Sequence, residues 1–324
     1  MKKMTQQEIA DSLHLSRRTV ARVLHNDQLV RPSTRRQVIA ALTRHGYYLQ
    51  THTKTETVLL DLMSSNGYFA RSVEPLMRRL TARNFNFVVT NHREDPGGFR
   101  KMVGRFDTLL FCSIPDEEAI RLARRENPII FIMNLFSNGV RGADISIEPD
   151  NFSGGKLAAK YLVTRGHQRI LVLHGASKSS LMRRDGFFAE VHFNHPECEV
   201  SFREMPLSPK DRMADELARY LAGLAAPPTA VFCTGGIIGD ILHSALAGLN
   251  WRVPDDLSVM SYDLPSDLGL DYSLEYDSVF YRPLQLVELA EYNLANRPLL
   301  QKGTKVDILV EPELDIHGSV KVLR

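Results

Sequence analysis

The chain has 324 residues, of which 44% are hydrophobic and 24% charged, which suits a globular protein of two or three domains. It contains no apolar run of the roughly 18 residues that span a membrane, and its polar opening segment does not have the pattern of a signal peptide. The three cysteines are far apart and the histidines show no metal-ligand spacing. We therefore expect a cytoplasmic protein with no membrane contact, no metal and no cofactor.

The first 47 residues predict three short helices. Thr5 and Glu8 have the spacing of a capping box, so the first helix is expected to start at Thr5. Ser16 can cap the second helix, Ser33 can cap the third, and Gly46 can end it. This is the pattern of a helix-turn-helix, which places its second helix in the major groove of DNA. The expected core positions are Ile9, Ala10, Leu13, Val20, Val23, Leu24, Val38, Ala41 and Leu42.

The charge of the chain is distributed unevenly. Residues 1–50 contain nine Lys or Arg and three acidic residues, a net charge of +6, whereas the whole chain has a net charge of +2 and the remainder therefore carries −4. A basic segment on a mildly acidic protein indicates that only this segment contacts phosphate. The alternative is a small helical dimerisation or packing domain with a solvated basic face, but capping, turn spacing and arginine placement together favour DNA binding.

A polar linker at residues 48–56 separates this segment from a pattern of alternating strands and helices. Strands are predicted at 58–63, 86–90, 108–112, 129–133, 170–173, 229–233 and 257–262, and helices at 72–84, 154–165, 184–193 and 237–249. Continuous apolar runs of this length are typical of parallel strands that are covered on both faces. The predicted fold is an all-α helix-turn-helix domain followed by an α/β region of two doubly wound lobes with a crevice between them.

Five segments carry motifs that occur together in one protein family. The first is the helical segment, with Ser16, Thr19-Val20, Arg22-Val23-Leu24, Thr34-Arg35, Val38 and Gly46-Tyr47; the others are DNFSGGKLAAKYLVTRGHQRILVLHG (150–175), RRDGF (183–187), RVPDDLSVMSYD (252–263) and PELDIHGS (312–319). With these motifs the chain resembles the LacI/GalR family of bacterial transcription regulators over nearly its whole length. The resemblance implies a DNA-binding domain at 1–47 and an effector-binding and dimerisation domain at 57–324. This second domain would consist of two periplasmic-binding-protein-like lobes, an N-lobe at about 57–150 and 282–310 and a C-lobe at about 151–281 and 311–324.

The resemblance also implies which residues meet double-stranded DNA, in a homodimer on a pseudo-palindromic operator. Arg17 and Arg18 are expected at base edges, where an arginine can bond guanine O6 and N7 together, although a phosphate contact alone is the alternative for each. Ser16 and Thr19 are expected at phosphate oxygens, and Arg22 at a base or a phosphate. The full expected set is Thr5, Ser16, Arg17, Arg18, Thr19, Arg22, His25, Arg31 and Thr34.

A small-molecule effector (a sugar, sugar phosphate or related metabolite) is expected between the lobes. Arg183 matches a family arginine that holds ligand oxygens, and Asp263 matches a family acid that accepts hydrogen bonds from ligand hydroxyls. An interlobe salt bridge without ligand is the alternative for this pair. Tyr68 and Phe69 are expected to form an aromatic wall, with core packing as the alternative. The full expected set is Tyr68, Phe69, Asn134, Arg183, Gly235 and Asp263.

The sequence departs from the family pattern in two places. Sugar-binding members usually carry Asn-Asp or a similar pair where this chain has Gly235 and Gly236, and Asn134 lies one position later than usual. The effector is therefore expected to be less hydroxylated than a hexose or to be anionic, unless the site has lost its ligand. The glycine run through Gly239 could cradle an anion, but a tight turn is the favoured interpretation. The short linker also lacks the family's hinge-helix motif, which predicts little bending of the DNA.

These patterns favour a transcription regulator of the repressor type that responds to an effector. The alternative is a cytoplasmic solute-binding module whose basic segment serves dimerisation or non-specific DNA contact. No P-loop, no G-x-S-x-G, no H-E-x-x-H and no spaced nucleophile–base pair occurs in the sequence. We therefore predict that the chain is not an enzyme and has no catalytic residues.

Overall fold

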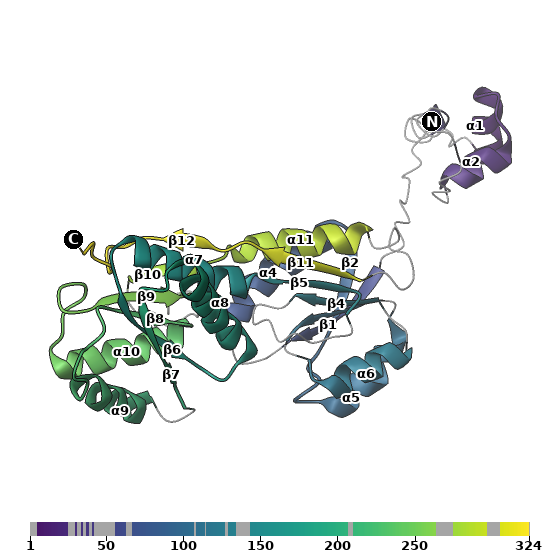
Figure 1. Cartoon of the computed structure of the whole chain (residues 1–324). Coiled ribbons are helices and arrows are strands. Elements are labelled where there is room, and N and C mark those ends of the chain that lie inside the picture. The colour runs from purple at the N-terminus through teal and green to yellow at the C-terminus, as the bar shows by residue number, and fades with distance from the viewer. Residues whose placement is uncertain are drawn as a thin grey trace. The chain divides into compact units, whose positions relative to one another are not determined.

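The computed structural model describes residues 5–24, 30, 34, 37–38, 41, 56–62, 67–106, 108–113, 115–126, 129–133, 143–206, 210–263, 275–296 and 305–323. The chain divides into two units, one comprising Met1–Thr57 and Leu80–Asn86 and the other Val58–Arg79 and Phe87–Arg324. The first contains the helical N-terminal segment, called the head below, and the second contains most of two β-sheets (Figure 1). Within the described ranges, no helix has both the length and the apolar character needed to cross a bilayer.

The head begins with α1 (Gln6–Ser12), which starts at the predicted capping box. The backbone N–H of Thr5 donates to Glu8 Oε2 at 2.5 Å, and the N–H of Glu8 donates to Thr5 Oγ1 at 3.3 Å. The hydrogen bond from the Thr5 backbone lowers the pKa of the Glu8 carboxyl, because it favours the ionised form. The predicted start of the first helix is confirmed.

A tight turn joins α1 to α2 (Arg17–Leu24). His14 adopts a left-handed conformation in this turn, with φ of 53°. The N–H of Thr19 donates to Ser16 Oγ at 3.0 Å, so Ser16 caps α2 as predicted. The buried core of the head consists of Ile9, Ala10, Val20, Val23, Val30 and Val38, with Leu13, Leu15 and Ala41 partly buried against it. Ser33, Leu42, Gly46 and the side chain of Leu24 lie outside the described residues.

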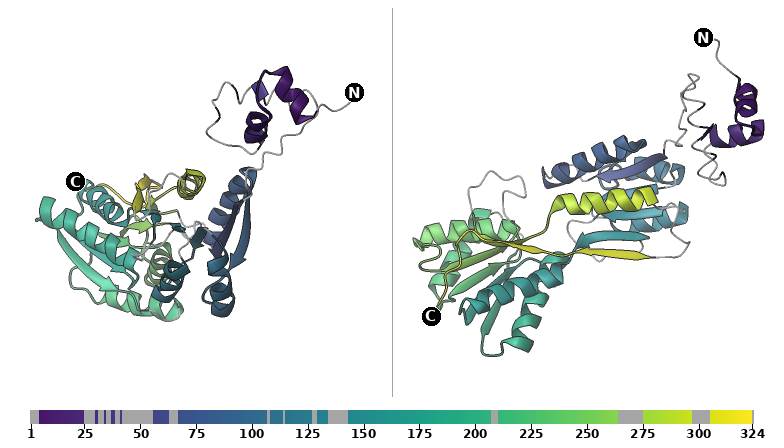
Figure 2. Two further views of the ribbon diagram at one scale, coloured as in Figure 1. Left: turned by 90° about the vertical axis from the view of Figure 1, so that its right-hand side faces the viewer. Right: turned by 90° about the horizontal axis from the view of Figure 1, so that it is seen from above.

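The first sheet has the strand order β11-β5-β4-β3-β1-β2. Its strands are β1 (Glu56–Leu62), β2 (Phe85–Thr90), β3 (Thr108–Cys112), β4 (Ile129–Met133), β5 (Ile145–Pro149) and β11 (Val306–Val310). Strands β1, β3, β4, β5 and β11 pair in parallel. The helices that accompany this sheet are α4 (Gly67–Ala82), α5 (Pro96–Met102), α6 (Glu117–Glu126) and α11 (Pro283–Asn296), with a 3-10 turn at Val103–Arg105. Helix α11 packs against β4 and β5 (Figure 2).

The second sheet has the strand order β12-β10-β9-β8-β6-β7. Its strands are β6 (Arg169–His174), β7 (Glu199–Glu204), β8 (Ala230–Cys233), β9 (Ser258–Tyr262), β10 (Asp277–Phe280) and β12 (Glu313–Asp315). All of these strands pair in parallel except β12, which is antiparallel to β10. The accompanying helices are α7 (Asn151–Thr164), α8 (Lys178–Asn194), α9 (Lys210–Ala222) and α10 (Gly236–Leu249).

Both faces of the second sheet are covered by helices. Leu171 and Val231 belong to a buried cluster with side chains of α9 and α10. The next residue along β8, Phe232, points to the other face and stacks on Phe187 of α8, with the ring centroids 5.3 Å apart. This double coverage explains why the strands are continuous apolar runs rather than alternating ones. The prediction of doubly wound α/β sheets is confirmed.

Helices α7 and α8 approach each other unusually closely because glycines lie at their contact. A Cβ atom on Gly155 of α7 would lie 1.9 Å from the carbonyl oxygen of Arg183, and one on Gly186 of α8 would lie 2.0 Å from the carbonyl oxygen of Phe152. A Cβ on Gly154 would lie 2.5 Å from the ring of Tyr262. Residues without a side chain are therefore required here, and the close contact sets the position of Arg183.

Candidate functional site

The first turn of α2 presents two exposed arginines. Arg17 and Arg18 are exposed, while Val20 and Val23 on the opposite face are buried in the core of the head. The helical periodicity thus separates an apolar inner face from a cationic outer face. Arg22 lies on the next turn and is half-buried. The N-terminal end of α2 therefore carries a concentrated positive charge that phosphate or guanine can meet.

The other residues that we predicted at DNA lie in the cap of α2, elsewhere in the head, or outside the described residues. The hydroxyls of Ser16 and Thr19 lie 2.8 Å apart in the cap of α2. Thr5 is exposed and takes part in the capping box of α1, and Thr34 is half-buried in a helical segment. The remaining two, His25 and Arg31, lie outside the described residues. The DNA-contact set stays a prediction.

A cavity of about 620 Å³ lies at the carboxyl ends of strands β6, β8 and β9. Ligand sites in parallel α/β sheets form at this edge, because the strand ends and the helix N-termini converge there. The lining residues are Gly175, Ala176, Ser177, Ser179, Ser180, Arg183, Met205, Pro206, Met213, Thr234, Gly235, Gly236, Ile237, Ile238, Ile241 and Asp263.

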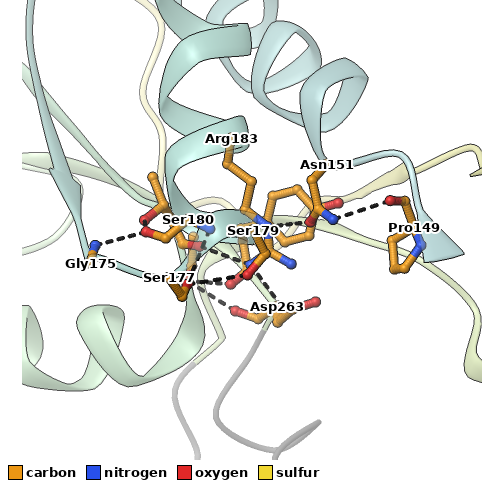
Figure 3. Close-up of polar contacts among 11 residues, drawn as sticks. Pro149, Asn151, Gly175, Ser177, Ser179, Ser180, Arg183 and Asp263 are labelled. Carbon is orange, nitrogen blue, oxygen red and sulfur yellow. Dashed lines mark hydrogen bonds and ion pairs between the residues drawn. The ribbon is translucent and has the colours of Figure 1, made fainter. Parts of the chain in front are cut away.

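Arg183 on α8 is the central charged residue of this cavity (Figure 3). Its Nε donates to Asn151 Oδ1 at 2.7 Å. Its Nη1 donates to the carbonyl oxygen of Thr234 at 2.8 Å and to Asp263 Oδ2 at 3.2 Å. The guanidinium also lies over the ring of Tyr262, with 3.4 Å between Cζ and the ring centroid. These contacts orient the guanidinium rigidly before any ligand binds.

The second terminal nitrogen of Arg183, Nη2, is buried and has no hydrogen-bond partner among the described residues. A buried donor without a partner is costly, so this nitrogen favours an acceptor from a ligand or a water molecule. Burial raises the pKa of the Tyr262 phenol well above its ordinary value. Tyr262 therefore stays neutral beneath the guanidinium and does not neutralise its charge.

Hydroxyl groups at the start of α8 form a second part of the site, which the sequence analysis missed. Ser177 caps α8 by accepting the N–H of Ser180 at 3.3 Å. The N–H of Gly175 donates to Ser180 Oγ at 2.7 Å, and Ser180 Oγ pairs with Thr234 Oγ1 at 2.5 Å. The signal was the group of serines that follows β6, at the start of α8 and at the carboxyl end of a parallel strand. The hydroxyl groups of these serines form most of their hydrogen bonds with other side-chain hydroxyls and with the backbone.

The structure brings together three of the residues that we predicted at the effector. Arg183, Gly235 and Asp263 line the same cavity. Tyr68 and Phe69 lie in the first turn of α4, but their side chains, like all of Asn134, lie outside the described residues. The interlobe location that we considered for the Arg183–Asp263 salt bridge is wrong. Both residues lie beside the same sheet. Arg183 is on α8, which accompanies the second sheet, and Asp263 directly follows β9 of that sheet.

The glycine run after β8 forms a tight turn, which was the favoured interpretation. Strand β8 ends at Cys233 and α10 begins at Gly236 with Gly235 as its N-cap. Gly235 has an extended backbone, and a Cβ there would lie 3.9 Å from Arg183 Nη1, an ordinary contact. Gly239 has a packing role, because its Cβ would lie 3.1 Å from Ser261 Oγ. Gly235 leaves open the space beside the guanidinium that an acidic side chain could fill.

Comparisons with known proteins agree with both parts of the structure. Residues 5–50 match the family model of bacterial regulatory proteins of the lacI family, and residues 159–273 match that of the periplasmic binding protein-like domain. The HTH-type transcriptional repressor PurR of Histophilus somni (strain 2336) is 24% identical, over 98% of this chain and 99% of that protein. The chain thus combines a DNA-binding domain of the lacI type with a periplasmic binding protein-like domain, and its relatives are LacI-family repressors. It is a DNA-binding transcription regulator.

Solved structures of LacI-type proteins share the whole fold of this regulator. The complex of the transcriptional regulator CelR with cellobiose superposes with a TM-score of 0.66 at 21% identity, over 98% of this chain and 99% of that one. The lac repressor dimer bound to operator and the anti-inducer ONPF superposes with a TM-score of 0.64 at 19% identity, over 99% and 100%. The predicted fold, a helix-turn-helix head followed by periplasmic-binding-protein-like lobes, is thereby confirmed.

Proposed function

We propose that this LacI-family chain is a transcriptional repressor whose head binds a pseudo-palindromic operator and whose affinity is set by a small molecule in the cavity beside Arg183. The observation that carries the proposal is the exposed pair Arg17 and Arg18 on the first turn of α2, held by a capped helix-turn-helix. The similarity to PurR and to the operator-bound lac repressor supports this role. The proposal assigns no enzymatic activity to the chain and places it in the cytoplasm, with the DNA.

In this proposal the head recognises the operator through two kinds of contact, one to the edges of the bases and one to the phosphates. Arg17 or Arg18 bonds guanine O6 and N7 in the major groove, a contact that discriminates against other bases by about 1–3 kcal/mol. The hydroxyls of Ser16 and Thr19, beside the positive end of α2, donate hydrogen bonds to phosphate oxygens and set the register of the helix. A homodimer places two such helices about 34–36 Å apart, one helical turn of DNA.

The effector acts by binding one conformation of the repressor more tightly than another. The cavity at the carboxyl edge of the second sheet supports this role, because it combines a rigidly held cation with hydroxyls and an apolar wall. The short segment between the head and β1 lacks the family's hinge-helix motif. We infer that the operator is bound with little bending, through base contacts and dimer spacing. A circular-permutation gel that shows a strong central kink would contradict this inference.

Selection of bound sequences from a library of random DNA duplexes tests the proposed function. The purified full-length protein is incubated with the library, and the retained duplexes are sequenced through successive rounds. We expect a pseudo-palindrome with guanine in each half-site, and an Arg18→Ala protein carried through the same rounds serves as the control that should lose the guanine preference. Failure of the folded wild-type dimer to enrich any sequence, with and without added metabolites, would favour a solute-binding module instead.

A further inference from the structure

One wall of the cavity beside Arg183 is apolar, which a sugar does not require. Two methionines, Met205 and Met213, come from the end of β7 and from α9, and three isoleucines come from the first turns of α10. The isoleucines are Ile237, Ile238 and Ile241, and Pro206 completes the wall. Ile237 is 60% exposed, although isoleucine is usually buried. A ligand with an apolar body would cover this surface and gain the free energy of its burial.

The opposite end of the cavity is electropositive. The N-termini of two helices, α8 and α10, line it, and the N-cap residue of α10, Gly235, provides no side-chain cap. Arg183 is only 3% exposed, and its Nη2 has no partner within the described part of the chain. Helix N-termini carry partial positive charge, which adds to the charge of the guanidinium. Asp263 is the one acidic residue in the described lining of the cavity, and its carboxylate already contacts Nη1.

The hydroxyls of the cavity are engaged with protein groups. Ser180 contacts Thr234 and the N–H of Gly175, and Ser177 contacts the N–H of Ser180 and the hydroxyl of Ser179. A polyhydroxylated ligand would need several donors and acceptors at once, because a polar group that is buried without a partner costs free energy. An anion needs fewer directed contacts, since the helix termini and Arg183 stabilise its charge collectively.

From these observations we propose that the effector is a small organic anion with an apolar body, such as an aromatic or branched carboxylate. Its charged group lies at the positive end, beside Arg183 and the N-termini of α8 and α10, and its body packs on the methionine and isoleucine wall. The inference rests on the proposed function, because it names the class of effector for the same cavity. It narrows the expectation from the sequence, which allowed a sugar, a sugar phosphate or a related metabolite and favoured a ligand that is less hydroxylated than a hexose or anionic.

Isothermal titration of the full-length protein with phenylacetate, 3-phenylpropanoate and 4-phenylbutanoate tests this proposal. We expect binding of the acids, with affinity that rises by about threefold for each added methylene as the body covers more of the wall. The matched neutral compound, phenylacetamide, should bind at least about tenfold more weakly than phenylacetate because it lacks the charge. Glucose and ribose serve as hydroxyl-rich controls.

Two pairs of variants test the two ends of the cavity separately. Gly235→Asp places a carboxylate beside the guanidinium, where a Cβ has room, and should weaken binding of the acids at least about tenfold by repulsion between like charges. Gly235→Asn has the same size without the charge and should weaken binding much less. Ile237→Ser should weaken binding about fivefold by removing apolar contact. Ile316→Ser, at a residue that is 57% exposed and outside the cavity lining, should leave binding unchanged.

The outcomes separate this inference from the proposed function. No binding of any of the three acids at millimolar concentration, or equal effects of Gly235→Asp and Gly235→Asn, would overturn the inference. Binding of glucose or ribose in place of the acids would also overturn it, and operator selection would still succeed. If the acids bind with the expected variant effects but no DNA sequence is enriched, the proposal of an organic-anion ligand is supported and the proposal that the chain is a repressor is refuted.

Discussion

Replacement of Gly155 by alanine tests whether the close contact of α7 and α8 positions Arg183. The new Cβ would lie 1.9 Å from the Arg183 carbonyl oxygen, whereas ordinary van der Waals contact begins at 3.4 Å. The helices would therefore have to separate by about 1.5 Å, and overpacking of this kind costs about 1–3 kcal/mol. The shift also strains the hydrogen bonds from Arg183 to Asn151 and Thr234, which are buried. We expect a total loss of about 3–5 kcal/mol in the free energy of unfolding.

Equilibrium unfolding in urea, followed by tryptophan fluorescence, measures this loss. Trp251 is the single tryptophan of the chain and packs against the core that the second sheet shares with α9 and α10. Gly248→Ala is the matched control, because its Cβ would meet nothing within 4 Å on α10, and it should stabilise by about 0.5–1 kcal/mol. A loss below about 1 kcal/mol in Gly155→Ala would refute the idea that the glycine contact is required.

Three further predictions address the head and the second sheet. Arg18→Ala should weaken binding to the selected operator by about 1–3 kcal/mol, far more than binding to random DNA; equal losses in a filter-binding assay would reassign this side chain to phosphate. Tyr161→Phe removes the 2.7 Å bond from the buried phenol to Asp277 and should cost about 1.5–3 kcal/mol in urea unfolding; an unchanged midpoint would show that the bond contributes nothing. Burial lowers the pKa of His167 from its ordinary 6.5, so below pH 6.5 the unfolded chain binds more protons than the folded one. Stability should therefore fall as the pH drops below this value, and His167→Gln should flatten the dependence; the same slope in both proteins would exclude His167 as its source.

The sequence predicted those elements whose residues carry a strong local signal. The capping box at Thr5 and the cap at Ser16 are short-range hydrogen bonds, so their residue types and spacing were sufficient. The buried central strands, such as β3 and β8, are continuous apolar runs, and their predicted bounds agree with the structure within one residue. Strand β7 was not predicted, because it is a polar strand at the edge of its sheet and lacks an apolar pattern.

The composition of the cavity required the tertiary structure. Arg183 and Asp263 could be placed by family motifs, but the residues around them come from segments far apart in the sequence, such as Ser180, Met205 and Thr234. Their meeting depends on the parallel order of β7, β6, β8 and β9, which brings the strand ends to one edge. Sequence periodicity reports which face of an element is buried, but it does not report which elements become neighbours. For that reason the sequence by itself indicated the family resemblance and the separate elements, while the three-dimensional fold alone decided that Arg183 and an apolar wall line the same cavity.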